Sequence, residues 1–235
     1  MHLFENKIKH ILDKQELAEI FYSGCKLSQG IGIESEKLLV YKDTKKAVKY
    51  SDIVKVLDCF NKSTWQRVYE GNSLIGLKSS IGTVSLEPGS QSEISLKPIE
   101  KIKDIEIHLT QFYSDLSSAA EKIGAEVLNS GIQPVSTYKD IEVIPKKRYE
   151  FMTKYLPLKG DEPFIMMRET AGIQANIDYK SEEDAVLKLS LALKMSPIVS
   201  AVYANSPVRA GKVTGLKSER AASWLKVDEK RCGLV

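Results

Sequence analysis

The chain has 235 residues and 43% of them are apolar, which is enough to bury a core in one large or two small domains. Its 34 basic and 31 acidic residues nearly balance, so the charge favours neither nucleic acid nor an anionic membrane as a partner. The sequence shows no long uninterrupted apolar run, no secretory signal pattern at its start and only three widely spaced cysteines, and we therefore expect a cytoplasmic protein with free thiols.

Helices are expected where apolar residues recur every three or four positions. Gly124 is suited to ending the longest of them, and Ser181 to capping the last, in which Pro197 should introduce a kink. Ser51 is suited to capping the second. The predicted helices cover residues 3–21, 51–61, 99–123 and 181–204, and a further short one follows Pro145.

Strands are expected in the intervening segments, where β-branched and other apolar residues alternate with polar ones. They are residues 31–40, 74–78, 83–87, 92–96, 125–132 and 172–179, with a hairpin turn at "SSIG". The helices and strands do not alternate regularly, which favours an α+β fold in which helices pack on one side of an antiparallel sheet. Because no repeat or flexible linker interrupts the chain, residues 1–235 are expected to form a single domain.

Three of these strand segments carry polar residues on one face. In "TVSLEPGSQSEISL" alternation places Glu87, Gln91 and Glu93 together, opposite the apolar residues. Taken alone, this pattern is also typical of a surface strand whose glutamates lie in water. The same pattern recurs with Glu34 and Glu36 in "IGIESEKLLV", and with Gln174, Asn176 and Asp178 in "GIQANIDY".

If these polar faces belong to one face of the sheet, several carboxylates lie close together. Like charges in that arrangement raise one another's pKa unless a cation lies between them. Carboxylate oxygens suit Mg²⁺, which keeps several waters and shares its other positions with substrate phosphates. The "EPG" sequence indicates a break that changes the direction of Glu87 relative to Glu93. The sequence therefore predicts a magnesium site.

Six motifs follow one another along the chain: "IGIESEKLLV", "LIGLKSSIGTVSLEPGSQSEIS", "GIQPVSTYKDIEVIPKKRYEFMTKYLP", "MMRETAGIQANIDYKSEEDAVLK", "ANSPVRAGKVTGLKSERAASW" and "DEKRCGL". In this order they resemble segments of the plant-type glutamate-cysteine ligases and their bacterial carboxylate-amine relatives. The resemblance implies a glutamine-synthetase-like fold, in which a curved, mainly antiparallel sheet forms a cup and helices pack on its outer face. It also implies ATP and Mg²⁺ as cofactors.

The activity that this resemblance implies is the joining of glutamate to cysteine. ATP would phosphorylate the glutamate γ-carboxylate, and the cysteine amine would attack the acyl phosphate to give γ-glutamylcysteine. The resemblance implies four magnesium ligands, Glu34, Glu36, Glu87 and Glu93, with Gln174 and Asn176 lining the same cup, and two substrate arginines, Arg148 and Arg220. Either arginine could instead be an ordinary surface residue. Arg168 lies one position earlier than in many family members and is left out of the site.

Chains of this family continue beyond the "DEKRCGL" motif, whereas the present sequence stops at Val235. We therefore expect a C-terminally truncated catalytic domain with an exposed sheet edge through which the chain can associate. A truncated non-catalytic remnant, a subunit that needs a partner, and a related ligase with another amine substrate are the alternatives.

Overall fold

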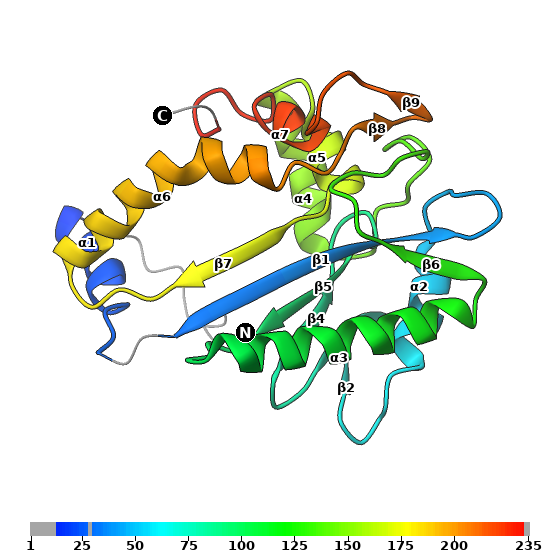
Figure 1. Cartoon of the computed structure of the whole chain (residues 1–235), viewed down its shortest axis with the longest axis horizontal. Coiled ribbons are helices and arrows are strands. Elements are labelled where there is room, and N and C mark those ends of the chain that lie inside the picture. The colour runs from blue at the N-terminus through cyan, green and yellow to red at the C-terminus, as the bar shows by residue number, and fades with distance from the viewer. Residues whose placement is uncertain (1–12, 28–29, 233–235) are drawn as a thin grey trace.

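A seven-stranded antiparallel sheet forms the centre of the computed structural model, which describes residues 13–27 and 30–232 (Figure 1). Long β1 pairs with β5 along one edge, and with β6 and β7 along successive parts of the other. The α+β class and the antiparallel sheet predicted from the sequence are confirmed. The order is β2 (Gln66–Glu70), β3 (Ser73–Lys78), β4 (Gly82–Leu86), β5 (Ser92–Leu96), β1 (Ile31–Tyr41) and β6 (Ala125–Leu128), with β7 (Ile173–Ile177) beside β1.

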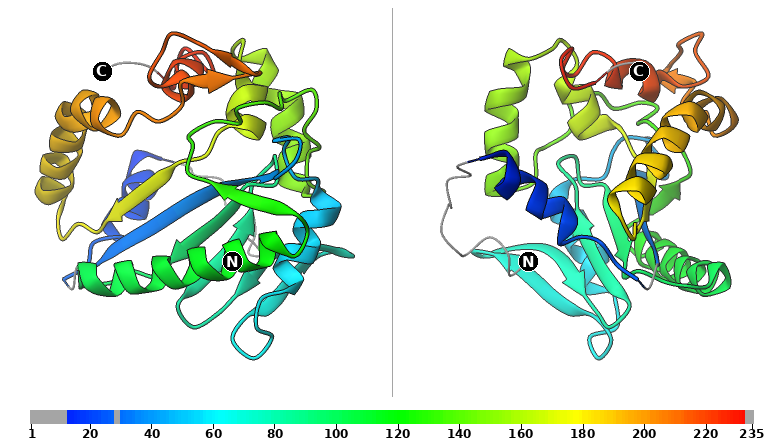
Figure 2. Two further views of the ribbon diagram at one scale, coloured as in Figure 1. Left: turned by 45° about the vertical axis from the view of Figure 1, so that its right-hand side comes forward. Right: turned by 90° about the vertical axis from the view of Figure 1, so that its left-hand side faces the viewer.

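The helices lie in three places around this sheet. Helices α2 and α3 pack along the sheet, α4, α5 and α7 gather beyond one of its ends, and α1 and α6 lie on the side of β7 (Figures 1 and 2). A small hairpin, β8 (Val208–Arg209) with β9 (Lys212–Val213), leads into α7. The helices are α1 (Lys14–Tyr22), α2 (Tyr50–Asp58), α3 (Ile102–Glu121), α4 (Lys147–Tyr155), α5 (Pro163–Glu169), α6 (Glu182–Val202) and α7 (Glu219–Trp224), and a 3-10 turn (Leu156–Leu158) follows α4.

The hydrophobic core lies between the sheet and helices α2 and α3. Both helices repeat apolar residues at helical spacing, so each presents one apolar face to the strands. The sheet contributes the apolar members of the alternating strands, such as Val84, Leu86 and Ile94, which are at most 1% exposed. Since side chains alternate along a strand, the polar members of β4 and β5 lie on the opposite face.

The same division applies to β1. The hydroxyl groups of Ser35 on β1 and Tyr113 on α3 lie 2.7 Å apart and share a hydrogen bond. Ser35 therefore faces the helices, and its neighbours Glu34 and Glu36 face the other way. The fold places the glutamates of β1 on the face of the sheet that α2 and α3 leave uncovered.

Most predicted elements are present with shifted ends. The first predicted helix is seen as α1, while its residues 3–12 lie outside the described part of the chain. Helix α2 begins at Tyr50 after Lys49, so the predicted cap at Ser51 is wrong, whereas Ser181 does cap α6, its hydroxyl accepting a hydrogen bond from the Asp184 N–H. Strand β6 ends at Leu128, four residues before the predicted end. Pro197 lies inside α6, which continues to Val202.

Candidate functional site

The four glutamates singled out in the sequence gather on the uncovered face of the sheet. Glu36 of β1 lies directly opposite Glu93 of β5 in the strand register, and Glu34 lies two residues before Glu36 on the same face. Glu87 directly follows β4, and its charge acts on both Glu36 and Glu93. We call these four residues, Glu34, Glu36, Glu87 and Glu93, the carboxylate face.

Residues on two strands and one residue just before a third supply hydrogen bonds that orient Glu36 and Glu93. Glu93 Oε1 accepts from the Ser95 hydroxyl at 2.9 Å and from the Ser85 hydroxyl at 3.3 Å. Glu36 Oε2 accepts from the backbone N–H of Gly172 at 2.6 Å. These donors lie on β4, on β5 and just before β7, so the pairing of the strands itself positions the carboxylates.

The electrostatics of this face are unfavourable for negative charge. Burial, followed by repulsion from Glu93 and Glu87, raises the pKa of Glu36 from 4.5 to about 7. Burial and the charge of Glu87 also raise the pKa of Glu93, although the Ser95 hydroxyl partly opposes this. The face therefore favours either a bound proton or a bound cation.

The loop after β4 aims Glu87 at this face. The Glu87 N–H donates to the Gln91 carbonyl at 2.9 Å, and Ser90 adopts a φ of +69°, so the chain turns tightly between β4 and β5. This turn is the break that "EPG" predicts. Gln91 does not line the cup as alternation suggested: it is 2% exposed, and its amide donates to the carbonyls of Met167 and Thr170.

Helix α4 holds the Glu87 side chain. The fully buried Tyr149 hydroxyl lies 3.1 Å from both Glu87 Oε1 and the Leu86 carbonyl, while Lys146 Nζ donates to the same carbonyl at 2.6 Å. Because Lys146 already donates to Leu86, the single phenolic proton of Tyr149 can serve Glu87. Burial and the Glu87 charge raise the pKa of Tyr149, so the phenol remains a donor.

Replacing Tyr149 with Phe should therefore remove the hydrogen bond that orients Glu87 without creating a large cavity. We expect the free energy of unfolding to fall by about 1–2 kcal/mol, measured by urea denaturation, and the binding of Mn²⁺ to weaken. Tyr155→Phe on the same helix is the control. Tyr155 is 42% exposed and its hydroxyl accepts an exposed hydrogen bond from Arg231, so this change should alter stability by less than about 0.5 kcal/mol. Equal stability and metal binding in Tyr149→Phe and the native protein would show that Tyr149 does not position Glu87.

The two candidate arginines have different environments. Arg220, on α7, is partly buried, stacks on Trp224 with 5.3 Å between guanidinium carbon and ring centre, and has a buried Nε without a hydrogen-bond partner among the described residues. Its charge acts on Glu36, and its Nη2 would lie 2.7 Å from a Cβ added to Gly172. Arg148 is exposed on α4, where its charge acts on Lys146 and Tyr149. The structure thus brings Arg220 directly to the carboxylate face and leaves Arg148 at its border.

The amides of β7 lie beside Glu34. Gln174 is opposite Glu34 in the register, and the Asn176 amide donates to Glu34 Oε1 at 3.1 Å. Both amides are exposed. The structure therefore places these two predicted residues beside Glu34, on the face of β7 that strand alternation predicts.

The donor set of this face fits a hard divalent cation. Within the described residues 13–27 and 30–232, no group of three or more His, Cys, Asp and Glu side chains is arranged to hold a metal by itself. Mg²⁺ does not require such a group, because it is commonly bound by one or two carboxylates together with water and substrate phosphates. Glu36 and Glu93, opposite each other with raised pKa values, are oxygen donors of this kind.

Another buried charged group was not predicted from the sequence. Glu169 at the end of α5 is fully buried, and Arg209 of β8 binds it with two hydrogen bonds of 2.6 and 2.9 Å. The Tyr138 N–H also donates to Glu169, and Arg168 Nη1 donates to the Tyr138 carbonyl. Arg168, left out of the predicted site, thus fixes a loop. No periodic pattern marks Glu169 or Arg209, because their partners are distant in the sequence.

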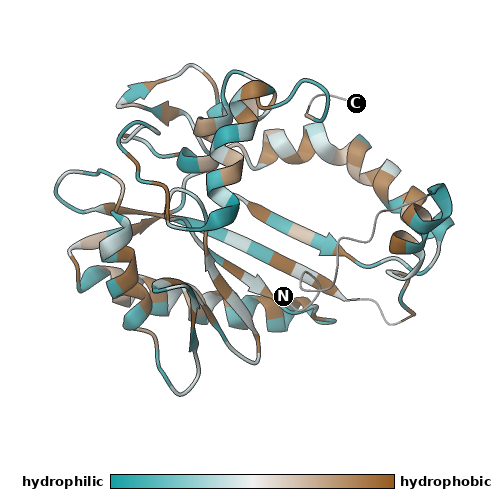
Figure 3. Ribbon diagram, turned by 180° about the vertical axis from the view of Figure 1, so that it is seen from behind, coloured by the Kyte–Doolittle hydropathy of each residue, from teal (hydrophilic) through white to brown (hydrophobic). Residues whose placement is uncertain are grey.

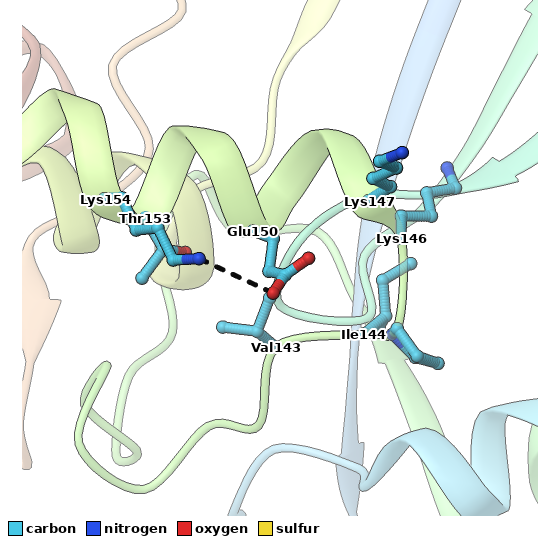
Figure 4. A pocket seen from close by; sticks show the side chains of 8 residues that line it. Val143, Ile144, Lys146, Lys147, Glu150, Thr153 and Lys154 are labelled. Atoms are coloured by element: carbon cyan, nitrogen blue, oxygen red, sulfur yellow. Dashed lines mark ion pairs between the residues drawn. The ribbon is translucent and has the colours of Figure 1, made fainter.

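A separate cavity of about 620 Å³ opens along α4 and the segment that precedes it (Figure 4). Its walls combine three lysines, Lys146, Lys147 and Lys154, with the aliphatic side chains of Val143 and Ile144. Glu150 pairs with Lys154 across 3.6 Å, and this ion pair is exposed. Lys146 is shared between this cavity and the support of Glu87.

Comparison with known proteins identifies the family. Residues 30–235 match the family described as glutamate-cysteine ligase family 2 (GCS2). The chain belongs to glutamate-cysteine ligase family 2. This confirms the resemblance drawn from the motifs, and the match includes every residue of the carboxylate face and both candidate arginines.

Curated members of this family resemble the chain over most of its length. It is 36% identical to the chloroplastic glutamate-cysteine ligase of Nicotiana tabacum, 35% to ligase A of Oryza sativa subsp. japonica and 34% to the ligase of Arabidopsis thaliana. Each match covers 95% of this chain and 44%, 46% and 44% of the respective relative, so the chain spans less than half their length. The cytoplasmic location expected from the sequence is contradicted here, because these relatives are chloroplastic.

A solved structure of glutamate-cysteine ligase from Francisella tularensis in complex with AMP also resembles this family member. The similarity has a TM-score of 0.44 and 19% sequence identity, and it covers 73% of this chain and 30% of that protein.

Proposed function

We propose that this chain carries the glutamate-binding and metal-binding part of an ATP- and Mg²⁺-dependent ligase that forms γ-glutamylcysteine from glutamate and cysteine. The observation that carries this proposal is the position of Arg220 beside the opposed carboxylates of Glu36 and Glu93. An arginine whose Nε has no hydrogen-bond partner in the described part of the chain suits a carboxylate substrate, and the glutamates suit a cation. Family membership supports the assignment of these groups to a ligase.

The proposed reaction needs orientation and charge compensation more than a protein nucleophile. The γ-phosphoryl group of ATP passes to the γ-carboxylate of glutamate, giving an acyl phosphate and ADP. The cysteine amine then attacks the acyl carbon, phosphate leaves, and the amine loses a proton as the amide forms. Mg²⁺, when bound, would compensate the negative charge of the phosphates.

The residues of the chain have distinct roles in this proposal. Glu34, Glu36, Glu87 and Glu93 would hold the cation. Gln174 and Asn176 would line the cup beside Glu34, where their exposed amides can bind the nucleotide or the substrate. Arg220 would orient a substrate carboxylate, and Arg148 would supply a second positive charge from α4.

The test is product formation. Purified chain with ATP, Mg²⁺, glutamate and cysteine should yield γ-glutamylcysteine by mass spectrometry, and Glu93→Gln should lower the rate at least about tenfold. Glu121→Gln changes a carboxylate on α3 that is 68% exposed and should leave the rate unchanged. Mn²⁺ binding, followed by electron paramagnetic resonance, should weaken in Glu93→Gln and stay unchanged in Glu121→Gln. Unchanged turnover and metal binding in Glu93→Gln would refute the metal role of this face.

A second candidate function is a subunit without catalytic activity of its own. The observation that favours it is the outer edge of β7, which has no strand partner within the described part of the chain. Metal and ATP binding without product would support this candidate. Product from another amine, screened in the same assay in place of cysteine, would instead identify a related carboxylate-amine ligase.

A further inference from the structure

Gly172 directly precedes β7 and contacts two charged residues of the site. Its N–H donates to Glu36 Oε2 at 2.6 Å, and its carbonyl accepts from the Glu36 N–H at 2.9 Å. These bonds lie where β7 and β1 run side by side, two strands that each combine hydrophilic and hydrophobic residues (Figure 3). The backbone of Gly172 therefore fixes both the main chain and the carboxylate of Glu36.

The guanidinium group of Arg220 occupies the space that a side chain at residue 172 would fill. A Cβ added to Gly172 would lie 2.7 Å from Arg220 Nη2, 3.2 Å from Cζ and 3.5 Å from Nε, and these are its three nearest atoms. The first of these distances is shorter than real Cβ contacts. Arg220 can therefore lie where it does only because residue 172 has no side chain.

The backbone does not require glycine at this position. The φ of Gly172 lies outside the left-handed region, so an alanine could adopt the same backbone conformation. A Cβ added here would meet only the far end of a flexible side chain, whereas a Cβ added to Gly89 would collide with the backbone of Arg168. Gly172 thus makes room for an arginine, and it is not needed to turn the chain.

Arg220 has a donor available for a ligand. Its guanidinium carbon lies 5.3 Å from the centre of the Trp224 ring, and its buried Nε has no hydrogen-bond partner within residues 13–27 and 30–232. Its charge acts on Glu36, which Gly172 holds through its backbone. One residue therefore sets the distance between the group suited to a carboxylate and the group suited to a cation.

We propose that Gly172 is a positioning residue, whose missing side chain lets Arg220 bind the carboxylate of the substrate beside the cation site at Glu36. The inference rests on the proposed function and extends it to a residue that acts through Arg220. Alanine at residue 172 would keep the N–H that binds Glu36 but would displace the guanidinium group. A planar guanidinium pairs with a carboxylate through two parallel hydrogen bonds, so its displacement weakens that pairing.

The first experiment compares the kinetics of Gly172→Ala and the native chain. We expect the KM for glutamate to rise at least about tenfold, while kcat and the KM for ATP change less than about threefold. Gly131→Ala is the matched control, because a Cβ there would lie 3.5 Å from Arg220 Cδ, which is an ordinary contact. It should leave all three constants unchanged, and both variants should unfold at nearly the urea concentration of the native chain.

The second experiment asks whether Gly172 acts through Arg220. Glutamate affinity is measured by calorimetry in the presence of Mg²⁺ and a non-hydrolysable ATP analogue. Gly172→Ala should weaken it in the native chain but have little further effect in an Arg220→Lys background, because lysine lacks the displaced guanidinium group. The Arg220 Nε–H signal in nuclear magnetic resonance spectra should shift in Gly172→Ala and stay in place in Gly131→Ala.

The outcomes separate this inference from the proposed function. Normal turnover with an unchanged glutamate KM in Gly172→Ala would keep the proposed function and overturn the role of Gly172. Equal losses in Gly131→Ala, additive losses in the Arg220→Lys background, or early unfolding of Gly172→Ala would also overturn that role. Weaker glutamate binding in Gly172→Ala, in a chain that forms no γ-glutamylcysteine, would support the role and refute catalysis by the chain alone. Absence of glutamate binding by the native chain would overturn both.

Discussion

Replacing Arg209 with Met should destabilise the protein by about 3–5 kcal/mol, because the change leaves the buried carboxylate of Glu169 without its charged partner. Glu169 is fully buried, whereas Arg209 is 21% exposed, so the cost of the variant comes from keeping the unpaired Glu169 charge away from water. The pair joins β8 to the end of α5, and the hydrogen bonds with Glu169 raise the pKa of Arg209. Urea denaturation at pH 7 measures the effect.

Two further variants separate this charge effect from a simple loss of packing. Adding Glu169→Gln to Arg209→Met removes the uncompensated charge while its side-chain oxygen can still accept from the Tyr138 N–H, so the double variant should be more stable than Arg209→Met alone. Lys154→Met breaks an ion pair whose partners are 74% and 68% exposed and should cost less than about 0.5 kcal/mol. If Arg209→Met costs no more than Lys154→Met, the buried pair does not stabilise the fold.

Glu36→Gln should make the protein more stable than the native form at pH 8. The pKa of Glu36 is raised from 4.5 to about 7 in the folded state, so the folded protein binds a proton there that the unfolded chain has released. The resulting stabilisation is complete below about pH 4.5 and is lost as the pH rises towards 7. Glutamine cannot ionise, so at pH 8 the variant should be more stable by about 1–3 kcal/mol, the upper value being the full shift converted to free energy.

The pH dependence is the decisive part of this measurement. Urea denaturation between pH 5 and pH 8 should show native stability falling relative to Glu36→Gln, and Glu121→Gln on α3 should follow the native curve. Mg²⁺ added at pH 8 should raise the free energy of unfolding of the native protein more than that of Glu36→Gln, because a cation compensates the repulsion between Glu36 and the neighbouring carboxylates. Parallel curves for the native protein and Glu36→Gln would mean that burial and the neighbouring carboxylates do not raise the pKa of Glu36.

Much of the carboxylate face could be predicted from local sequence. Alternation along a strand assigns Glu34 and Glu36 to one face and Ser35, which lies between them, to the other, wherever the strand lies. The "EPG" sequence likewise marks a turn, since proline and glycine disfavour a continuing ladder. Family motifs then supplied Arg220 as a candidate, and the structure places it beside Glu36.

The sequence could not predict the partners of these residues. In "KKRYEFM" it singled out Arg148, yet the neighbouring Tyr149 is the side chain that reaches Glu87, because successive helical residues point in different directions. Gln91 was assigned to the cup by strand alternation, but the tight turn directs its amide to the carbonyls at the end of α5. Such contacts depend on how separate elements pack.

By itself the sequence determined the class of the fold, the faces of its main strands and the family, since these follow from short-range periodicity and from motifs that are local in the chain. Only the tertiary structure decided that Glu36 lies opposite Glu93, that Arg209 neutralises Glu169, and that α6 and β7 remain uncovered. These features depend on strand register and on long-range packing, in which residues tens of positions apart come into contact. The local pattern of a strand or helix specifies which face is apolar, but it does not specify what lies against that face.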